Sequence, residues 1–121
     1  MIGYKAFDKN FISLTGYDFK KDGEAIGTVH RHIGEVRVGK SGFHFSSELQ
    51  DCISYFPITS DMLVCEIEAR GDISEAETSV KSCGLLEIKR RISLDEVRDF
   101  ITKSRPAYRW SSGIGESKTI F

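Results

Sequence analysis

Three histidines stand where their rings could contribute to a binding or metal site. His30 and His32 are two residues apart, so in an extended segment both rings would lie on one face. Together with Cys52 or an acidic residue they could ligate a metal ion, since zinc accepts imidazole and thiolate ligands. No third ligand follows at a characteristic spacing, and two histidines facing solvent from a loop are the simpler interpretation. We therefore assign no metal-ligating residues from the sequence. Whether His30 and His32 contact a metal stays open at this point.

His44 lies between Phe43 and Phe45. On a strand the two phenylalanines would point away from the histidine and anchor the segment in the core. A ring held in this way at the edge of a cleft could act in catalysis or contact a ligand. A hydrogen-bonded histidine with a structural role is the interpretation that we favour.

The C-terminal part of the chain combines cations with aromatic residues. Between Lys81 and Arg109 there are eight basic and four acidic residues. Arginines next to Tyr108 and Trp110 could bind an anionic ligand, a nucleotide or an acidic protein surface, although solvated charges around a buried aromatic anchor are the more ordinary explanation. The binding residues expected on this surface are Arg90, Arg91, Arg105, Tyr108, Arg109 and Trp110.

The composition restricts the class of protein. The 121 residues, 40% hydrophobic and 29% charged, fit one globular domain, 1–121. A net charge of −1 provides no overall field for nucleic acid or anionic lipid, so we expect no membrane association and regard nucleic acid as a less favoured partner. Three cysteines without a C-x-x-C pair, and an N-terminus unlike a signal peptide, predict a cytoplasmic protein with free thiols.

Short runs of β-branched and aromatic residues predict most of the secondary structure. We expect strands at 2–7, 11–19, 35–38, 43–45, 62–69 and 85–92, with a surface loop or hairpin over 20–34. In the segment from Met62 to Ala69, Leu63, Cys65 and Ile67 alternate with Val64, Glu66 and Glu68, as in a strand with one wet face. The tripeptide 70–72 is expected to end this strand as a turn.

Two helices are predicted by their caps and apolar spacing. The first follows Ser46 or Ser47 and ends before Pro57, giving a helix over 48–56. The second begins at a capping box formed by Ser93 and Glu96 and covers 94–103. Several strands, two short helices and no regular β-α alternation predict an α+β fold, with the helices packed on a mainly antiparallel sheet.

Four segments resemble a known family in order and spacing: Gly3-Tyr4-Lys5-Ala6-Phe7-Asp8, Gly42-Phe43-His44-Phe45, the stretch 65–72 and the stretch 90–94. They are similar to an uncharacterised domain family found widely in bacteriophage and prophage genomes, over about residues 2–100, with 101–121 as a C-terminal extension. Members carry a cysteine where this chain has Ser46. The resemblance implies a small accessory protein in the cytoplasm of a bacterial host.

A second resemblance is to the ADP-ribosyltransferases. Their cleft uses a first-strand residue, a G-x-Y-F segment leading into a helix that ends in tyrosine, and a late-strand glutamate. The matching positions are Tyr4, His44 within Gly42-Phe43-His44-Phe45, Tyr55 and Glu87. The resemblance implies an ADP-ribosyltransferase-like fold with NAD as cofactor and Glu87, His44 and Tyr4 as catalytic residues, Glu87 stabilising oxocarbenium charge.

These observations lead to two functional hypotheses. The first is a non-enzymatic phage-type protein without a cofactor, which binds a host protein through its basic and aromatic surface and could inhibit a host defence system. The second is an NAD-dependent ADP-ribosyltransferase, or a degenerate nucleotide-binding relative with the same cleft. Self-association is compatible with both, since the strand-like end at Ile120 and Phe121 could pair with another subunit.

Overall fold

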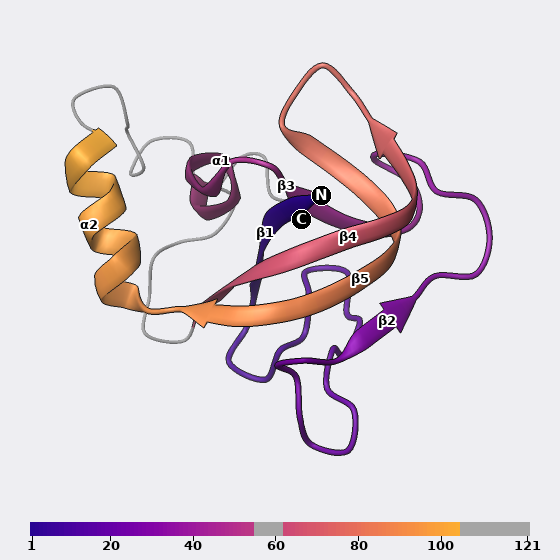
Figure 1. The fold of residues 1–121 in the computed structure, drawn as a ribbon, viewed down its shortest axis with the longest axis horizontal. Coiled ribbons are helices and arrows are strands. Elements are labelled where there is room, and N and C mark those ends of the chain that lie inside the picture. The colour runs from indigo at the N-terminus through magenta and orange to yellow at the C-terminus, as the bar shows by residue number, and fades with distance from the viewer. Residues whose placement is uncertain (55–61, 105–121) are drawn as a thin grey trace.

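The computed structural model describes residues 1–54 and 62–104 (Figure 1). Strands and helices follow one another as β1 (Ile2–Phe7), β2 (Val29–Arg31), β3 (Phe43–Ser46), α1 (Leu49–Ser54), β4 (Leu63–Glu75), β5 (Val80–Ile92) and α2 (Leu94–Ser104). The α+β class with a mainly antiparallel sheet is confirmed. No helix in the described ranges is both long and apolar enough to span a membrane.

The five strands form one antiparallel sheet that closes on itself. Their order is β2-β5-β3-β1-β4, and β4 also pairs with β5. The long β4–β5 hairpin curves around the sheet (Figure 1), so that β5 reaches β3 through Phe43↔Cys83 while β4 pairs with β1 through Lys5↔Cys65. This closure brings β1, β2 and β3 together, although long segments of chain separate them.

The prediction that residues 70–72 form a turn and end the strand is wrong, because β4 continues to Glu75. The pairing with β5 shifts between Arg70 and Ile73, and Gly71 has a φ of 74°. Such an irregularity bends a strand without ending it. Pairing with β5 therefore overrides the local turn preference of this tripeptide.

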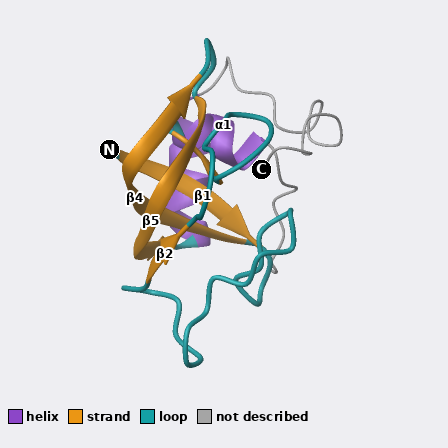
Figure 2. Cartoon of the chain, turned by 90° about the vertical axis from the view of Figure 1, so that its right-hand side faces the viewer, coloured by secondary structure: helices purple, strands orange, loops and turns teal. Residues whose placement is uncertain are grey.

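Both faces of the sheet are covered. Leu63, Cys65 and Ile67 pack on one face with aromatic residues that include Phe7 and Phe19, which confirms the predicted alternation. On the other face Val64 is buried, since α1 contributes Cys52 and Ile53 and α2 contributes Val97 to a second cluster. Figure 2 shows the helices behind the strands, with the loops around β2 extending away from them. Of the face expected to be wet, Val64 is thus covered, whereas Glu66 and Glu68 stay partly exposed.

The connection between β1 and β3 differs most from expectation. The predicted strands at 11–19 and 35–38 are absent, and isolated bridges at Ile12↔Asp18 and Arg37↔Ser41 take their place. The Asp8 carboxylate accepts hydrogen bonds from the amides of Asn10 and Ile12, at 2.7 and 3.1 Å, which starts a turn where an extended run was predicted. The expected loop over 20–34 contains β2.

The helix starts follow local rules. In the predicted capping box, Ser93 Oγ accepts from the Glu96 amide at 3.1 Å and Glu96 Oε1 accepts from the Ser93 amide at 3.2 Å. Before α1, Ser46 Oγ accepts from the Glu48 amide at 3.1 Å, just ahead of the helix. The capping box predicted for α2 is thus confirmed in detail. Ser46, in contrast, caps a turn that leads into α1.

Candidate ligand-binding site

A groove of about 390 Å³ opens between β2, β3 and the loops beside them. Its volume lies within the range of small-molecule sites. It is lined by Thr15, Tyr17, Arg31, His32, Ile33, Gly39, Lys40, Ser41, Gly42, Phe43 and His44. It is larger than three other cavities of the described residues, which have volumes of about 20, 250 and 300 Å³.

The groove is electropositive. Arg31 and Lys40 contribute two cations, and none of the lining residues is Asp or Glu. Within residues 1–54 and 62–104, no carboxylate lies close enough to pair with Arg31 or Lys40, although most other cations on the surface have such a partner. The arrangement therefore favours an anionic ligand.

An aromatic wall separates the groove from the core. The Phe43 ring lies 5.1 Å from that of Tyr17, 5.3 Å from that of Phe19 and 6.2 Å from that of His32. Phe43 is buried, whereas Tyr17 is 40% exposed. An exposed ring held on edge-to-face neighbours can stack against a flat ligand with little loss of side-chain entropy.

His44 lines the groove from β3 and also holds its rim. Its Nε2 accepts a hydrogen bond from the Gly39 amide at 2.7 Å, so the neutral ring carries its proton on Nδ1. Burial, followed by the nearby Lys5 charge, lowers the pKa of His44 below its ordinary value. The expected structural role agrees with these contacts.

The rim itself depends on a glycine and leaves one polar atom without a partner. Gly42 has a φ of 91°, and a Cβ there would collide with Ser82 Oγ and approach Cys83 O to 3.0 Å. Ser41 Oγ is buried in the groove wall with no hydrogen-bond partner among the described residues. Buried hydroxyls are normally paired, so this one is an exception among the described residues.

The prediction that His30 and His32 both face solvent is wrong. His30 is buried, with Nδ1 3.2 Å from Tyr17 Oη and Nε2 2.8 Å from Thr28 Oγ1. His32 is half-buried and its Nε2 lies 3.0 Å from the Glu35 carbonyl oxygen. The described residues contain no group of three or more His, Cys, Asp or Glu side chains that could hold a metal. The rings of His30 and His32 instead contact Phe43 and support the aromatic wall.

A smaller cavity of about 20 Å³ adjoins the groove. The two cavities share Thr15, Tyr17, Gly42, Phe43 and His44, and Lys5, Ser13 and Phe19 complete the inner one. Lys5 is 2% exposed and its Nζ donates to the His44 carbonyl oxygen at 2.5 Å. Burial lowers the pKa of Lys5 to about 8.

Sequence reasoning missed Lys5 as a site residue, as it missed Tyr17, Arg31 and Lys40. One signal was present: within the strand Ile2–Phe7, Lys5 falls on the same side as Phe7, which is the inward side. A lysine at an inward strand position is rarely buried without a specific reason. Nothing comparable marks Arg31 or Lys40, which reach the groove from the connection between β1 and β3.

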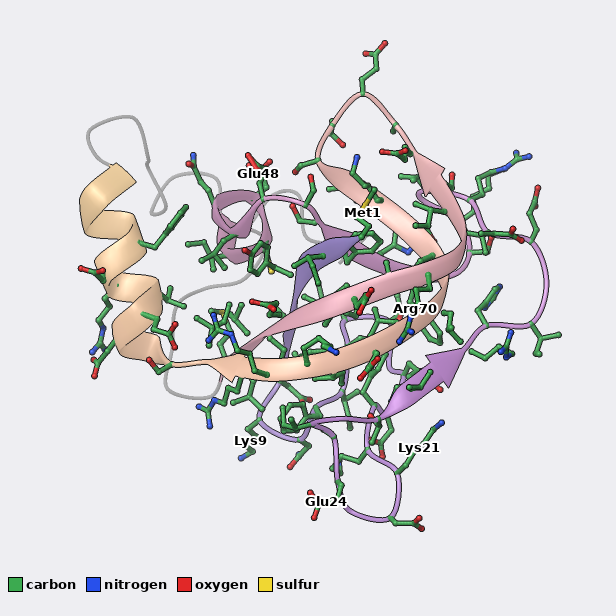
Figure 3. All side chains as sticks on the ribbon, in the orientation of Figure 1. Met1, Lys9, Lys21, Glu24, Glu48 and Arg70 are labelled. Atoms are coloured by element: carbon green, nitrogen blue, oxygen red, sulfur yellow. The ribbon has the colours of Figure 1, made fainter. Side chains whose placement is uncertain are left out.

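The residues matched to the ADP-ribosyltransferase cleft lie apart. Tyr4 packs with Leu49 and Phe100 and lines two cavities of about 250 and 300 Å³ beside the helices. Glu87 pairs with Arg70 and, at 3.4 Å, with Lys89, and it lines none of these cavities. Figure 3 places Arg70 on the outer hairpin ribbon. Of the proposed catalytic residues, only His44 lies at the groove, and Tyr55 is outside the described residues.

The predicted basic and aromatic surface is described only in part. Arg90 is exposed and pairs with Glu66 and Glu96, both at 3.3 Å. Arg91 is also exposed. The other expected binding residues, Arg105, Tyr108, Arg109 and Trp110, lie outside the described residues.

Comparisons with known proteins give a family without an activity. Neither the curated proteins nor the solved structures include a significant match. A family model described as "Domain of unknown function (DUF7666)" matches residues 1–99, a range that includes the groove and the inner cavity. The resemblance to an uncharacterised domain family is thereby confirmed, and the chain belongs to the DUF7666 family.

Proposed function

We propose that this domain is a binding module for a small anionic ligand that carries a flat ring, of the nucleotide class. The observation that supports this proposal is the groove of about 390 Å³, which has two cations, no carboxylate and an exposed aromatic ring in its lining. These are the features by which proteins recognise phosphate groups next to a heterocycle.

Each part of the ligand has a matching group. The Arg31 guanidinium offers planar paired donors to a phosphate, and Lys40 adds a second, point-like charge to the lining. Tyr17 offers its exposed ring to the flat part of the ligand. The pKa of His44 is lowered, so at neutral pH its ring adds polarity without adding charge.

Binding without catalysis is the form of the nucleotide hypothesis that the geometry favours. Transfer of ADP-ribose from NAD needs a carboxylate at the reacting ribose. Glu87 is held in ion pairs away from the groove, and no other Asp or Glu lines it. The proposal therefore corresponds to the degenerate nucleotide-binding relative, and NAD is one of the ligands to test.

The test is a titration of isotope-labelled protein with AMP, ADP and NAD, followed by amide chemical shifts. We expect shifts at Tyr17, Arg31 and Lys40. The double variant Arg31→Ala/Lys40→Ala should weaken binding about tenfold or more, as expected for losing charge-assisted hydrogen bonds. The double variant Lys9→Ala/Arg98→Ala removes the same charge from exposed positions outside the groove, and Figure 3 shows Lys9 on a loop. The proposal fails if no nucleotide shifts the groove amides, or if both double variants lose affinity equally.

A second candidate is the binding of a host macromolecule by a phage-type accessory protein that inhibits a host defence system. One observation favours a protein partner: Ile33, at the groove rim, is 84% exposed, and Ile26 and Val29 are 45% and 37% exposed nearby in the chain. Capture from host lysate with wild-type protein and with Ile33→Asp tests it. A partner retained equally by both proteins would contradict the use of this surface.

A further inference from the structure

We propose that the inner cavity is a site for one anionic oxygen, a carboxylate or phosphoryl oxygen of the ligand held in the groove, with Lys5 as its counter-ion. This inference rests on the proposed function, because it adds the position at which the ligand's charged end is recognised. It assigns a role to a buried lysine that the groove alone does not explain.

Residues that carry donors line this cavity. They are Lys5, Ser13 and Thr15, whereas the hydroxyl of Tyr17 in the same lining is hydrogen-bonded to His30 Nδ1 at 3.2 Å. Ser13 Oγ and Thr15 Oγ1 are 3.0 Å apart, and since one donates to the other, the pair keeps a hydroxyl hydrogen for a third acceptor. The lining includes no Asp or Glu. An oxyanion is the group that such a set of donors recognises.

The size of the cavity limits what can enter. About 20 Å³ is slightly more than the space that one water molecule requires. A whole phosphate or ring is therefore too large, whereas a single oxygen projecting from a ligand in the adjoining groove fits. The five lining residues that the two cavities share place the inner site directly beside the groove.

The electrostatic surroundings of Lys5 agree with this assignment. Lys5 Nζ lies over the Phe7 and Phe19 rings, 6.0 and 5.6 Å from their centroids. Titratable groups near Lys5 among the described residues include the thiols of Cys52 and Cys83, the His44 ring and Tyr17. Burial raises the pKa of both thiols, to about 12 for Cys83. Near neutral pH these thiols are uncharged.

The experiment compares AMP with adenosine, which lacks the anion, on wild-type protein and on Lys5→Met. We expect Lys5→Met to weaken AMP binding about tenfold to a hundredfold, the range of a lost hydrogen bond to a charged group. Adenosine affinity should stay unchanged. Equal AMP affinity in the two proteins would overturn the inference, and the nucleotide proposal would stand.

A second arm uses wild-type protein alone, so it does not depend on how the variant folds. AMP affinity should decline above pH 8, where the Lys5 ammonium loses its proton, while adenosine affinity stays constant. Tyr17→Phe should keep the same pH profile. An AMP affinity that is flat from pH 7 to 9.5, or a decline that disappears in Tyr17→Phe, would overturn the inference.

A third arm separates this inference from the nucleotide proposal. Inorganic phosphate and acetate are titrated separately, with the Ser13 and Thr15 amides as probes, and the stronger ligand distinguishes a phosphoryl from a carboxylate source. Shifts with either anion in wild type but not in Lys5→Met support the site even if no nucleotide binds. If phosphate, acetate and AMP all leave these amides unshifted, the inner site is wrong even if adenosine occupies the groove.

Discussion

The Lys5 ammonium group donates a hydrogen bond to the main-chain carbonyl of His44, 2.5 Å away, and so joins β1 to β3 beside the groove. The ring of the same histidine accepts from the Gly39 amide at 2.7 Å. One residue thus connects the buried lysine to the turn that forms the rim. Changes at Lys5, His44 or the rim glycines should consequently affect stability in distinct, measurable ways.

Replacing Lys5 by methionine should change how stability depends on pH. The pKa of Lys5 is lowered from 10.5 to about 8 in the folded protein, so between these values the unfolded chain binds more protons. The contribution of Lys5 to stability is therefore fully present above pH 10.5 and is lost as the pH falls through 8. The free energy of unfolding of wild type, minus that of Lys5→Met, should rise by about 3 kcal/mol over this range.

Urea denaturation at several pH values measures this difference. The raised pKa values of Cys52, Cys65 and Cys83 act in the opposite direction above pH 9, since the unfolded chain loses thiol protons first. Both proteins contain these thiols, so the subtraction removes most of their effect. A difference that stays constant with pH would show that the folded and unfolded states bind the Lys5 proton equally.

Replacing His44 by alanine should cost about 1–3 kcal/mol, because the Gly39 amide loses its acceptor. The comparison with His44→Gln, which restores an acceptor of similar reach, isolates the hydrogen bond from the loss of the ring. Chemical denaturation at pH 7.5 gives both values. Equal losses in the two variants would contradict the importance of this bond.

Mild acid should destabilise the wild-type protein. Burial is the largest cause that lowers the pKa of both His30 and His44, so the unfolded chain takes up their protons first as the pH falls below 6.5. The stability that these neutral rings provide is present above pH 6.5 and is lost toward their lower folded pKa values. We expect a smaller loss between pH 7 and 5.5 in His44→Gln, measured by thermal unfolding. An identical loss in both proteins would assign the effect to other groups.

Replacing Gly42 by alanine should be more destabilising than the same change at Gly39. Both residues have a positive φ, 91° and 85°, so alanine strains the backbone at each by about 1 kcal/mol. A Cβ at Gly39 meets open space, whereas at Gly42 it collides with Ser82 Oγ. Overpacking should add about 1–3 kcal/mol for Gly42→Ala. Similar melting temperatures for the two variants would indicate that the rim can move to accommodate the methyl group.

Replacing Glu87 by glutamine should leave ligand binding unchanged and cost less than about 1 kcal/mol, because its ion pairs with Arg70 and Lys89 lie near the surface. Titration with NAD tests ligand binding, urea denaturation tests stability, and incubation with labelled NAD tests for catalysis. If wild type modifies a target with NAD and Glu87→Gln abolishes the reaction, the catalytic alternative regains support.

The sequence alone determined the elements whose signals are local. The Ser93–Glu96 capping box lies within four residues and forms as predicted. The inward side of β4 follows from an alternation of period two, which is the same in any sheet that buries one face. From these signals the α+β class and both helix starts could be predicted.

Only the tertiary structure decided where the site lies. The groove combines residues of the β1–β3 connection with β2 and β3, and the inner cavity adds Lys5 from β1. Their proximity depends on the register of β5 with both β2 and β3, and on the β4–β5 hairpin that closes the sheet. Pairing between distant segments is set by the burial of whole faces, which no short window of sequence contains. For the same reason the turn at 70–72 was mispredicted, since pairing along β5 outweighed a local preference.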